Sequence, residues 1–113
     1  MADCLFCTIA RGTMKVDKLY EDELVFSIRD IHPRAPVHVM VISKEHIPTA
    51  TELTDEHGPL LGRLFAAAAK VAQQEGLHQR GYRLAFNVGE HAGMTISHLH
   101  LHMLGGRPLG PEG

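Results

Sequence analysis

Three histidines near the end of the chain alternate with apolar residues, and this alternation constrains the fold more than any other feature. The alternating residues are His98, Leu99, His100, Leu101, His102 and Met103. Because successive side chains of a β-strand face opposite ways, the pattern predicts a strand with one buried apolar face and one face of imidazoles. Imidazole acts as a nucleophile, an acid–base group or a metal ligand near neutral pH. We therefore expect a sheet with chemistry on one face.

The geometry of a strand limits what the three histidines can do together. A strand rises roughly 3.3 Å per residue, so the Cα atoms of neighbouring histidines lie roughly 6.6 Å apart and those of the outer two roughly 13 Å. Two neighbours can share an ion at zinc–nitrogen distances of about 2.0 Å, but three in a regular strand cannot. At least one histidine needs a separate role. A sheet edge that merely carries polar side chains outward is the alternative.

Length, composition and charge are those of one globular domain. The chain has 113 residues, of which 44% are hydrophobic and 21% charged, and we expect a single domain over residues 1–113. The net charge of −2 does not favour a nucleic-acid partner, although a single nucleotide can be bound locally. The sequence has no run of eighteen apolar residues and no apolar leader after Met1. We expect a cytoplasmic protein that does not contact a membrane.

Hydrophobic periodicity predicts five strands and two helices. The strands are expected at 19–21, 25–29, 38–42, 82–88 and 98–104, and a short helix at 4–11. A longer helix carries apolar residues at helical spacing over 60–72 and ends at Gly76. Its start is either capped by Thr54 or placed at Pro59, because a residue before proline avoids the α conformation. Strands that are mostly adjacent in sequence predict an α+β fold around a five-stranded antiparallel sheet, with one long and one short helix.

Cys4 and Cys7 are the only cysteines of the chain, and their spacing is C-x-x-C. In a reducing compartment this pair indicates metal binding or redox chemistry rather than a structural disulfide. Together with two distant histidines it makes the ligand set of a closed zinc site. Two reduced cysteines that only pack on a helix are the alternative. A thioredoxin-like role is disfavoured because no βαβ pattern accompanies the motif.

The segment from Gly93 to Leu104 resembles the signature of the histidine triad (HIT) family, His-x-His-x-His-x-x with apolar x. The resemblance extends over nearly the whole chain, through Asp30-Ile31, Ala35-Pro36-x-His38, Asn87 and Leu104-Gly105-Gly106-Arg107. It implies a HIT-like fold. The Leu-Gly-Gly-Arg ending is similar to that of the purine nucleoside phosphoramidase branch, whereas dinucleoside polyphosphate hydrolases have a proline-arginine sequence there.

This resemblance implies hydrolysis of the P–N bond of purine nucleoside 5′-phosphoramidates, and of aminoacyl-adenylates such as lysyl-AMP, without a catalytic cofactor. The reaction passes through a covalent nucleotidyl-histidine. His100 corresponds to the nucleophile, and a backbone carbonyl of the same strand holds one of its ring nitrogens. His102 and His38 correspond to groups that flank the phosphate and stabilise its charge. His98 completes the expected catalytic set.

The resemblance also assigns the nucleotide contacts. Asp30 corresponds to the residue that accepts the ribose hydroxyls, and Asn87, Gly93 and Thr95 to the phosphate-binding group. The apolar wall of the base pocket corresponds to Leu5, Phe6, Ile9, Ile28, Ile31 and Met40. Apolar walls select weakly between bases, so adenine and guanine are both expected. Turn formation and core packing remain the alternatives for these residues taken singly.

Several family members bind a structural zinc ion (Zn2+), and the corresponding ligands here are Cys4, Cys7, His46 and His98. Members of the branch are homodimers, and strand 82–88 is a plausible exposed edge for such pairing. Two other functions stay open. One is a zinc-binding, nucleotide-binding regulatory module without turnover, and the other is a dinucleoside polyphosphate hydrolase.

Overall fold

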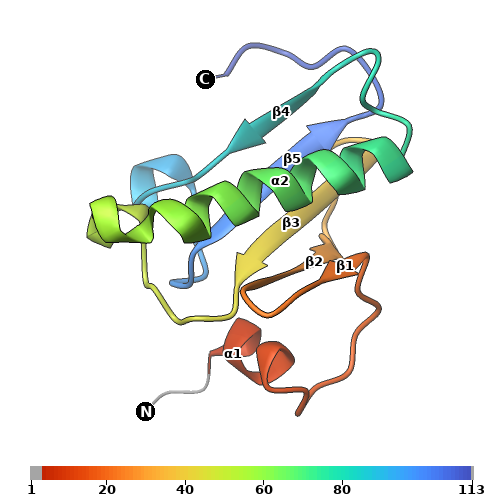
Figure 1. Ribbon diagram of the computed structural model, residues 1–113. Helices are drawn as coiled ribbons and strands as arrows, with labels where there is room; N and C mark the ends of the chain where they lie inside the picture. Colours follow the sequence, from red (N-terminus) through yellow and green to blue (C-terminus); the bar gives the residue numbers. More distant parts are fainter. Residues whose placement is uncertain (1–3, 113) are drawn as a thin grey trace.

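The computed structural model describes residues 4–112, in which a five-stranded antiparallel sheet is crossed by a long helix (Figure 1). The strands are β1 (Tyr20–Glu21), β2 (Val25–Arg29), β3 (Val37–Ser43), β4 (Tyr82–Ala85) and β5 (His100–Gly105). The sheet order is β1-β2-β3-β5-β4. The helices are α1 (Leu5–Ala10) and α2 (Gly58–Gln74). This arrangement confirms the predicted α+β fold.

Two separate cores lie on the two faces of the sheet. Alternate residues of β2 and β3, among them Val25, Val39 and Val41, pack with the buried side of α2. The intervening residues Phe26, Ile28, Met40 and Ile42 pack with Phe6 and Ile9 of α1. The period-two alternation of the strands thus places the long helix on one face and the short helix on the other.

The register of β5 decides which face carries the histidines. His102 pairs with Met40 and His100 with Ile42, so both histidines lie on the α1 face. Leu99, Leu101 and Met103 are buried on the α2 face, as the alternation predicts. The prediction that the strand begins at His98 is wrong, because β5 begins at His100. Just before it, the Leu99 carbonyl still accepts from the Ser43 amide of β3 at 3.3 Å, but the Leu99 amide donates to the Ile47 carbonyl of a loop at 2.7 Å.

Three further boundaries differ from or refine the expectations. Helix α2 begins at Gly58, next to the proposed start at Pro59, and Thr54 caps the short 3-10 helix Asp55–His57 instead. Gly76, with φ +77°, follows the C-terminal end of α2 as predicted. Strand β4 ends at Ala85 rather than at residue 88, because the chain leaves the ladder and Asn87 turns to the pocket described below. The connections contain two more 3-10 turns, Ala50–Glu52 and Glu90–Ala92.

Over residues 4–112, none of the helices has the length and apolar character needed to cross a membrane.

Candidate active site

A pocket of about 600 Å³ opens on the α1 face of the sheet. One wall is apolar and contains all six residues expected around a base, namely Leu5, Phe6, Ile9, Ile28, Ile31 and Met40. The lining also contains the residues expected to contact the ribose and the phosphate, namely Asp30, Asn87, Gly93, Thr95, His100 and His102. Ile31 lies at the mouth, with 84% of its surface exposed. The structure therefore brings together the apolar and polar halves of the predicted nucleotide site.

His100 is held in one orientation at the floor of this pocket. Its Nδ1 lies 2.6 Å from the backbone carbonyl oxygen of His98, so Nδ1–H donates to that oxygen. A neutral imidazole carries a single N–H, which leaves the lone pair of Nε2 free. The Phe6 ring packs edge-on against His100 at a centroid distance of 5.3 Å. His100 thus has the free nitrogen that a nucleophile needs.

A chain of hydrogen bonds sets the tautomer of His102. The backbone amide of Arg34 donates to Nδ1 of His38 at 3.2 Å. The other ring nitrogen of His38, Nε2, must then carry the proton, and it donates to Nδ1 of His102 at 2.9 Å. His102 consequently carries its own proton on Nε2. Burial is the main cause that lowers the pKa of His38, and it lowers the pKa of His102 to about 4, so both rings are neutral donors at pH 7.

His38 does not sit where the sequence predicted. We expected it to flank the phosphate, but it is only 2% exposed, lies behind His102 and is not among the residues that line the pocket. The reason is that His38 and His102 come from the adjacent strands β3 and β5, and the His38 ring, tilted by 51° at a centroid distance of 5.1 Å, bonds to the Nδ1 side of His102. Asp30 approaches His38 as well, with 3.4 Å between Oδ2 and Nε2.

The loops around the pocket carry its remaining polar groups. Asp30 follows β2 directly, and its Oδ1 accepts a hydrogen bond from the His32 amide at 2.9 Å, which fixes the carboxylate at the pocket wall. Gly93 has φ +80°, a left-handed conformation that favours glycine and turns the 3-10 segment Glu90–Ala92 back toward Thr95. Asn87 and Thr95 reach the pocket from the two ends of this loop.

Cys4, Cys7, His46 and His98 form a second group, which we call the Cys/His cluster. One ligand atom of each residue lies within 4.8 Å of all the others. The His98 Nδ1 is 3.2 Å from Cys4 Sγ and 3.1 Å from His46 Nδ1, while Cys7 Sγ is 3.3 Å from His46 Nδ1. Tetrahedral zinc with bonds of about 2.0 Å to nitrogen and 2.3 Å to sulfur spaces its ligands by about 3.3 to 3.8 Å. The cluster fits a tetrahedral metal ion.

His98 belongs to the cluster rather than to the pocket lining. Its ring is 1% exposed, and Nε2–H donates to the Ser43 carbonyl oxygen at 2.6 Å, which leaves Nδ1 as the free nitrogen toward the cysteines. The expectation that the His98 side chain joins the catalytic set is not supported by this placement. Its contribution to the pocket is the backbone carbonyl that holds His100.

Some residues of the site could not be identified from the sequence. Arg34 contributes its backbone amide and Ser43 its backbone carbonyl. Almost every residue type has these groups, so the sequence does not mark the two positions. Met14, Val16, Met94 and Ile96 also line the pocket. They belong to loops without hydrophobic periodicity, and none of them is fully buried, so no pattern in the sequence marks them as part of the site.

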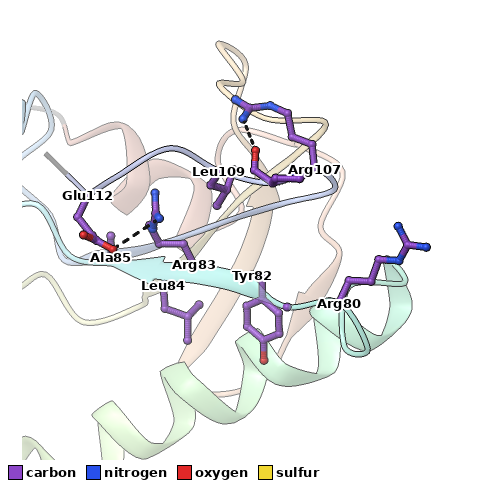
Figure 2. Close-up of a pocket in the computed structure, with 10 residues that line it drawn as sticks. Arg80, Tyr82, Arg83, Leu84, Ala85, Arg107, Leu109 and Glu112 are labelled. Atoms are coloured by element: carbon purple, nitrogen blue, oxygen red, sulfur yellow. Dashed lines mark hydrogen bonds and ion pairs between the residues drawn. The ribbon is translucent and has the colours of Figure 1, made fainter.

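A shallower hollow of about 610 Å³ lies at β4, away from the histidines (Figure 2). Tyr82 and Leu84 point toward α2, whereas Arg83 points to the opposite side, toward the C-terminal segment. There Arg83 donates to the Gly110 carbonyl oxygen at 2.8 Å and faces Glu112. Strand β4 is an edge of the sheet, as predicted, and this hollow follows that edge.

Comparison with known proteins agrees with this arrangement. The family model described as "Scavenger mRNA decapping enzyme C-term binding" matches residues 3–108. The purine nucleoside phosphoramidase of Escherichia coli (strain K12) is 45% identical over 96% of this chain and 92% of its own length. An uncharacterised HIT-like protein of Synechococcus elongatus is 46% identical over 95% of this chain and 93% of its own.

Solved structures show the same likeness over the full fold. A HIT family hydrolase from Legionella pneumophila superposes with a TM-score of 0.94 at 44% identity and covers 98% of this chain and 100% of its own. A HIT family hydrolase from Clostridium thermocellum gives a TM-score of 0.93, also at 44% identity, over 98% and 96% of the two chains. With its alternating histidines, its sheet order and these relatives, the chain belongs to the histidine triad family.

Proposed function

We propose that this protein hydrolyses the P–N bond of purine nucleoside 5′-phosphoramidates. The observation that carries the proposal is the orientation of His100, whose Nδ1 is bound to the His98 carbonyl beside a pocket with an apolar wall and a polar rim. The E. coli relative named purine nucleoside phosphoramidase supports the choice of reaction. A histidine with one occupied and one free nitrogen suits nucleophilic attack at phosphorus.

The proposed mechanism has two steps. Nε2 of His100 attacks the phosphorus, and the P–N bond breaks as the amine leaves and takes up a proton from solvent. Water then attacks the phosphorus of the nucleotidyl-histidine and gives a proton back to solvent, which breaks the P–Nε2 bond, releases the nucleoside monophosphate and restores the neutral ring. In both steps Nε2–H of His102 donates to a phosphate oxygen on which charge develops, and Asn87 and Thr95 add hydrogen bonds.

Substrate recognition follows the two halves of the pocket. The Asp30 carboxylate accepts hydrogen bonds from the ribose hydroxyls, and the base lies against the apolar wall that includes Phe6 and Ile28. Gly93 lets the loop backbone approach the phosphate. Because the wall offers few polar groups, both adenine and guanine nucleotides are accepted. Aminoacyl-adenylates such as lysyl-AMP present the same nucleotide half with a different leaving group, and we propose them as further substrates.

The test uses adenosine 5′-phosphoramidate with the purified protein. We expect release of AMP by the wild type and a loss on the order of 10³-fold or more in kcat for His100→Ala. His78→Ala is the matched control because His78 is exposed and does not line the pocket. Undiminished turnover by His100→Ala overturns the nucleophile assignment. Mass spectrometry of rapidly quenched reactions checks the intermediate, which should appear as one added nucleotidyl group on His100.

We also propose that the Cys/His cluster binds one structural zinc ion. Four ligands without an open position are typical of structural rather than catalytic zinc, so the ion ties α1 to the sheet. Elemental analysis should find one zinc per chain in the wild type and little in His46→Ala.

A second copy of this chain is the partner that we propose for the β4 edge. Phe65 of α2 is 44% exposed and packs edge-to-face on Phe86, next to the half-exposed Val88. An unpaired strand with apolar neighbours is a liability that homodimerisation removes. The hollow at β4 leaves room along this edge (Figure 2). We further propose a cytoplasmic location, where the thiols of Cys4 and Cys7 stay reduced.

A further inference from the structure

We propose that the metal-loaded Cys/His cluster positions the nucleophile and the nucleotide wall, with His98 and Phe6 as the positioning residues that connect the two sites. This inference rests on the proposed function, in which His100 attacks phosphorus. It goes beyond a structural role for zinc, because it makes the state of the cluster set nucleotide affinity and the tautomer of His100.

The first connection runs through His98. Its ring is bound on both sides, with Nδ1 in the cluster and Nε2–H donating to the Ser43 carbonyl at 2.6 Å. The backbone carbonyl of the same residue accepts from Nδ1 of His100, also at 2.6 Å. Residue 98 precedes β5 and has no partner in the strand ladder. Its carbonyl shares a peptide unit with the Leu99 amide, which donates to the Ile47 carbonyl at 2.7 Å. The cluster adds a second anchor, through the ring of the same residue.

The second connection runs through helix α1. The helix has six residues, and a helix this short is not stable without tertiary contacts. Cys4 caps its start and Cys7 lies within it, so two of the four cluster ligands tie α1 to the sheet. Phe6, 1% exposed, packs edge-on against both His98 and His100 at centroid distances of 5.7 and 5.3 Å. The same side chain lines the nucleotide pocket.

Loss of the metal therefore has a specific expected effect. The nitrogen atoms of His46 and His98 face each other at 3.1 Å, and they and the two thiols lose the ion that draws them together. The carbonyl of residue 98 and the ring of Phe6 then gain freedom. The His100 ring is no longer restricted to the tautomer with Nδ1–H, and the apolar wall opens. The α2 face of the sheet shares none of these residues and is not expected to change.

The experiment compares Cys7→Ala with Val71→Ala, a buried substitution on the α2 face that lowers stability without touching the α1 face. For each protein we measure bound zinc, the affinity for AMP by calorimetry, the ring 15N shifts of His100 by NMR, and kcat and KM separately. Cys7→Ala should lose zinc, bind AMP about tenfold more weakly and show a mixture of His100 tautomers. Val71→Ala should match the wild type in all three. Zinc loss with unchanged AMP affinity and unchanged His100 shifts overturns the proposal.

Chelation and re-addition of zinc provide the same comparison if Cys7→Ala does not fold. In the wild-type protein, AMP affinity should fall when zinc is removed and recover when it is added back. The ring 15N shifts of His100 should change and return with the zinc content in the same way. A wild type that takes up no zinc also overturns the proposal. Neither AMP binding nor NMR requires turnover. A protein that shows the coupling yet cleaves no phosphoramidate would contradict the proposed function alone.

Discussion

At the scale of single residues, the active site depends on which nitrogen of each histidine carries the proton. For each ring, a hydrogen bond to a backbone group, made directly or through another histidine, decides which nitrogen carries the proton. The His98 carbonyl sets His100, and the Arg34 amide sets His38, which in turn sets His102. Burial keeps the rings of His38 and His102 neutral, and backbone hydrogen bonds orient the rings of the site.

Replacement of His38 tests the orienting chain. In His38→Leu, Nδ1 of His102 loses its donor, and the ring can adopt the tautomer that presents a lone pair to the phosphate. We expect kcat to fall by about 10- to 100-fold with little change in AMP affinity, because His38 does not line the pocket. His38→Gln, whose amide can still donate, should recover part of the rate. Steady-state kinetics and calorimetry measure both quantities, and an equal loss in the two variants would contradict the orienting role.

The low pKa of His102 predicts how stability depends on pH. Its pKa is about 4 in the folded protein, chiefly because the ring is buried, against 6.5 in the unfolded chain. Between these values the unfolded state binds more protons, so stability falls as the pH drops from about 6.5 to about 4. The full loss of unfolding free energy that follows from the lowered pKa of His102 is on the order of 3 kcal/mol. Urea unfolding between pH 7 and pH 4 measures the free energy of unfolding of the wild type and of His102→Asn. This free energy should decrease less with falling pH in the variant. Equal pH dependence in the two proteins would refute the low pKa of His102.

At the scale of elements, the β1–β2 turn is held by one carboxylate. Burial raises the pKa of Asp22, but hydrogen bonds from the Tyr20 hydroxyl and the amides of Leu24 and Val25 outweigh it and lower the pKa to about 2. The stability that Asp22 contributes is present above about pH 4 and lost as the pH falls toward 2. We expect Asp22→Ala to cost about 2 kcal/mol at pH 7, measured by urea unfolding, and the deficit to shrink in acid. A deficit independent of pH would show that the charge is not involved.

A buried hydroxyl on β2 predicts a substitution that does not lower stability, in contrast to Asp22→Ala. Within the described residues, Ser27 Oγ is fully buried and has no hydrogen-bond partner. Ser27→Ala removes a polar atom that has lost its contact with water, so the variant should be as stable as the wild type or more stable, by up to about 1 kcal/mol. Thermal unfolding measures the effect. A clear loss of stability would mean that the hydroxyl has a partner, such as a bound water.

At the scale of the whole molecule, the two faces of the sheet and its β4 edge have different roles. The α2 face provides the larger core, and the α1 face carries the pocket and the Cys/His cluster. Strand β4 ends the sheet on the side away from β1 (Figure 1). Phe65 and Phe86 lie beside that edge. A second copy at this position would extend the sheet and leave both pockets on the same face.

Phe65→Asp tests this assembly. A carboxylate in place of an exposed aromatic ring disfavours an apolar contact between copies while leaving the fold intact. Light scattering at micromolar concentration should give the mass of two chains for the wild type and of one chain for the variant. Gln79→Asp adds the same charge on an exposed loop and should leave the mass unchanged. A wild type with the mass of one chain would refute the homodimer.

The sequence predicted much of the molecule because its strongest signals are local. The period-two pattern around Leu101 and the helical spacing over 60–72 gave the elements and their buried faces, and both agree with the structure. The residues proposed for the base wall do lie together. The errors fall where the chain leaves regular structure, at the start of β5 and the end of β4, since loop contacts such as Leu99 to Ile47 end a ladder without a residue signal.

By itself, the sequence determined the alternating faces, the fold class and the residue types available for chemistry, because side-chain period and composition are properties of neighbouring residues. Only the tertiary structure decided which groups each histidine contacts. The pairing of β5 between β3 and β4 placed His102 against His38, and the loop after β3 brought His46 to the cysteines of α1. These contacts join side chains of residues 39 to 94 positions apart, so they follow from the folded path of the chain rather than from any local pattern.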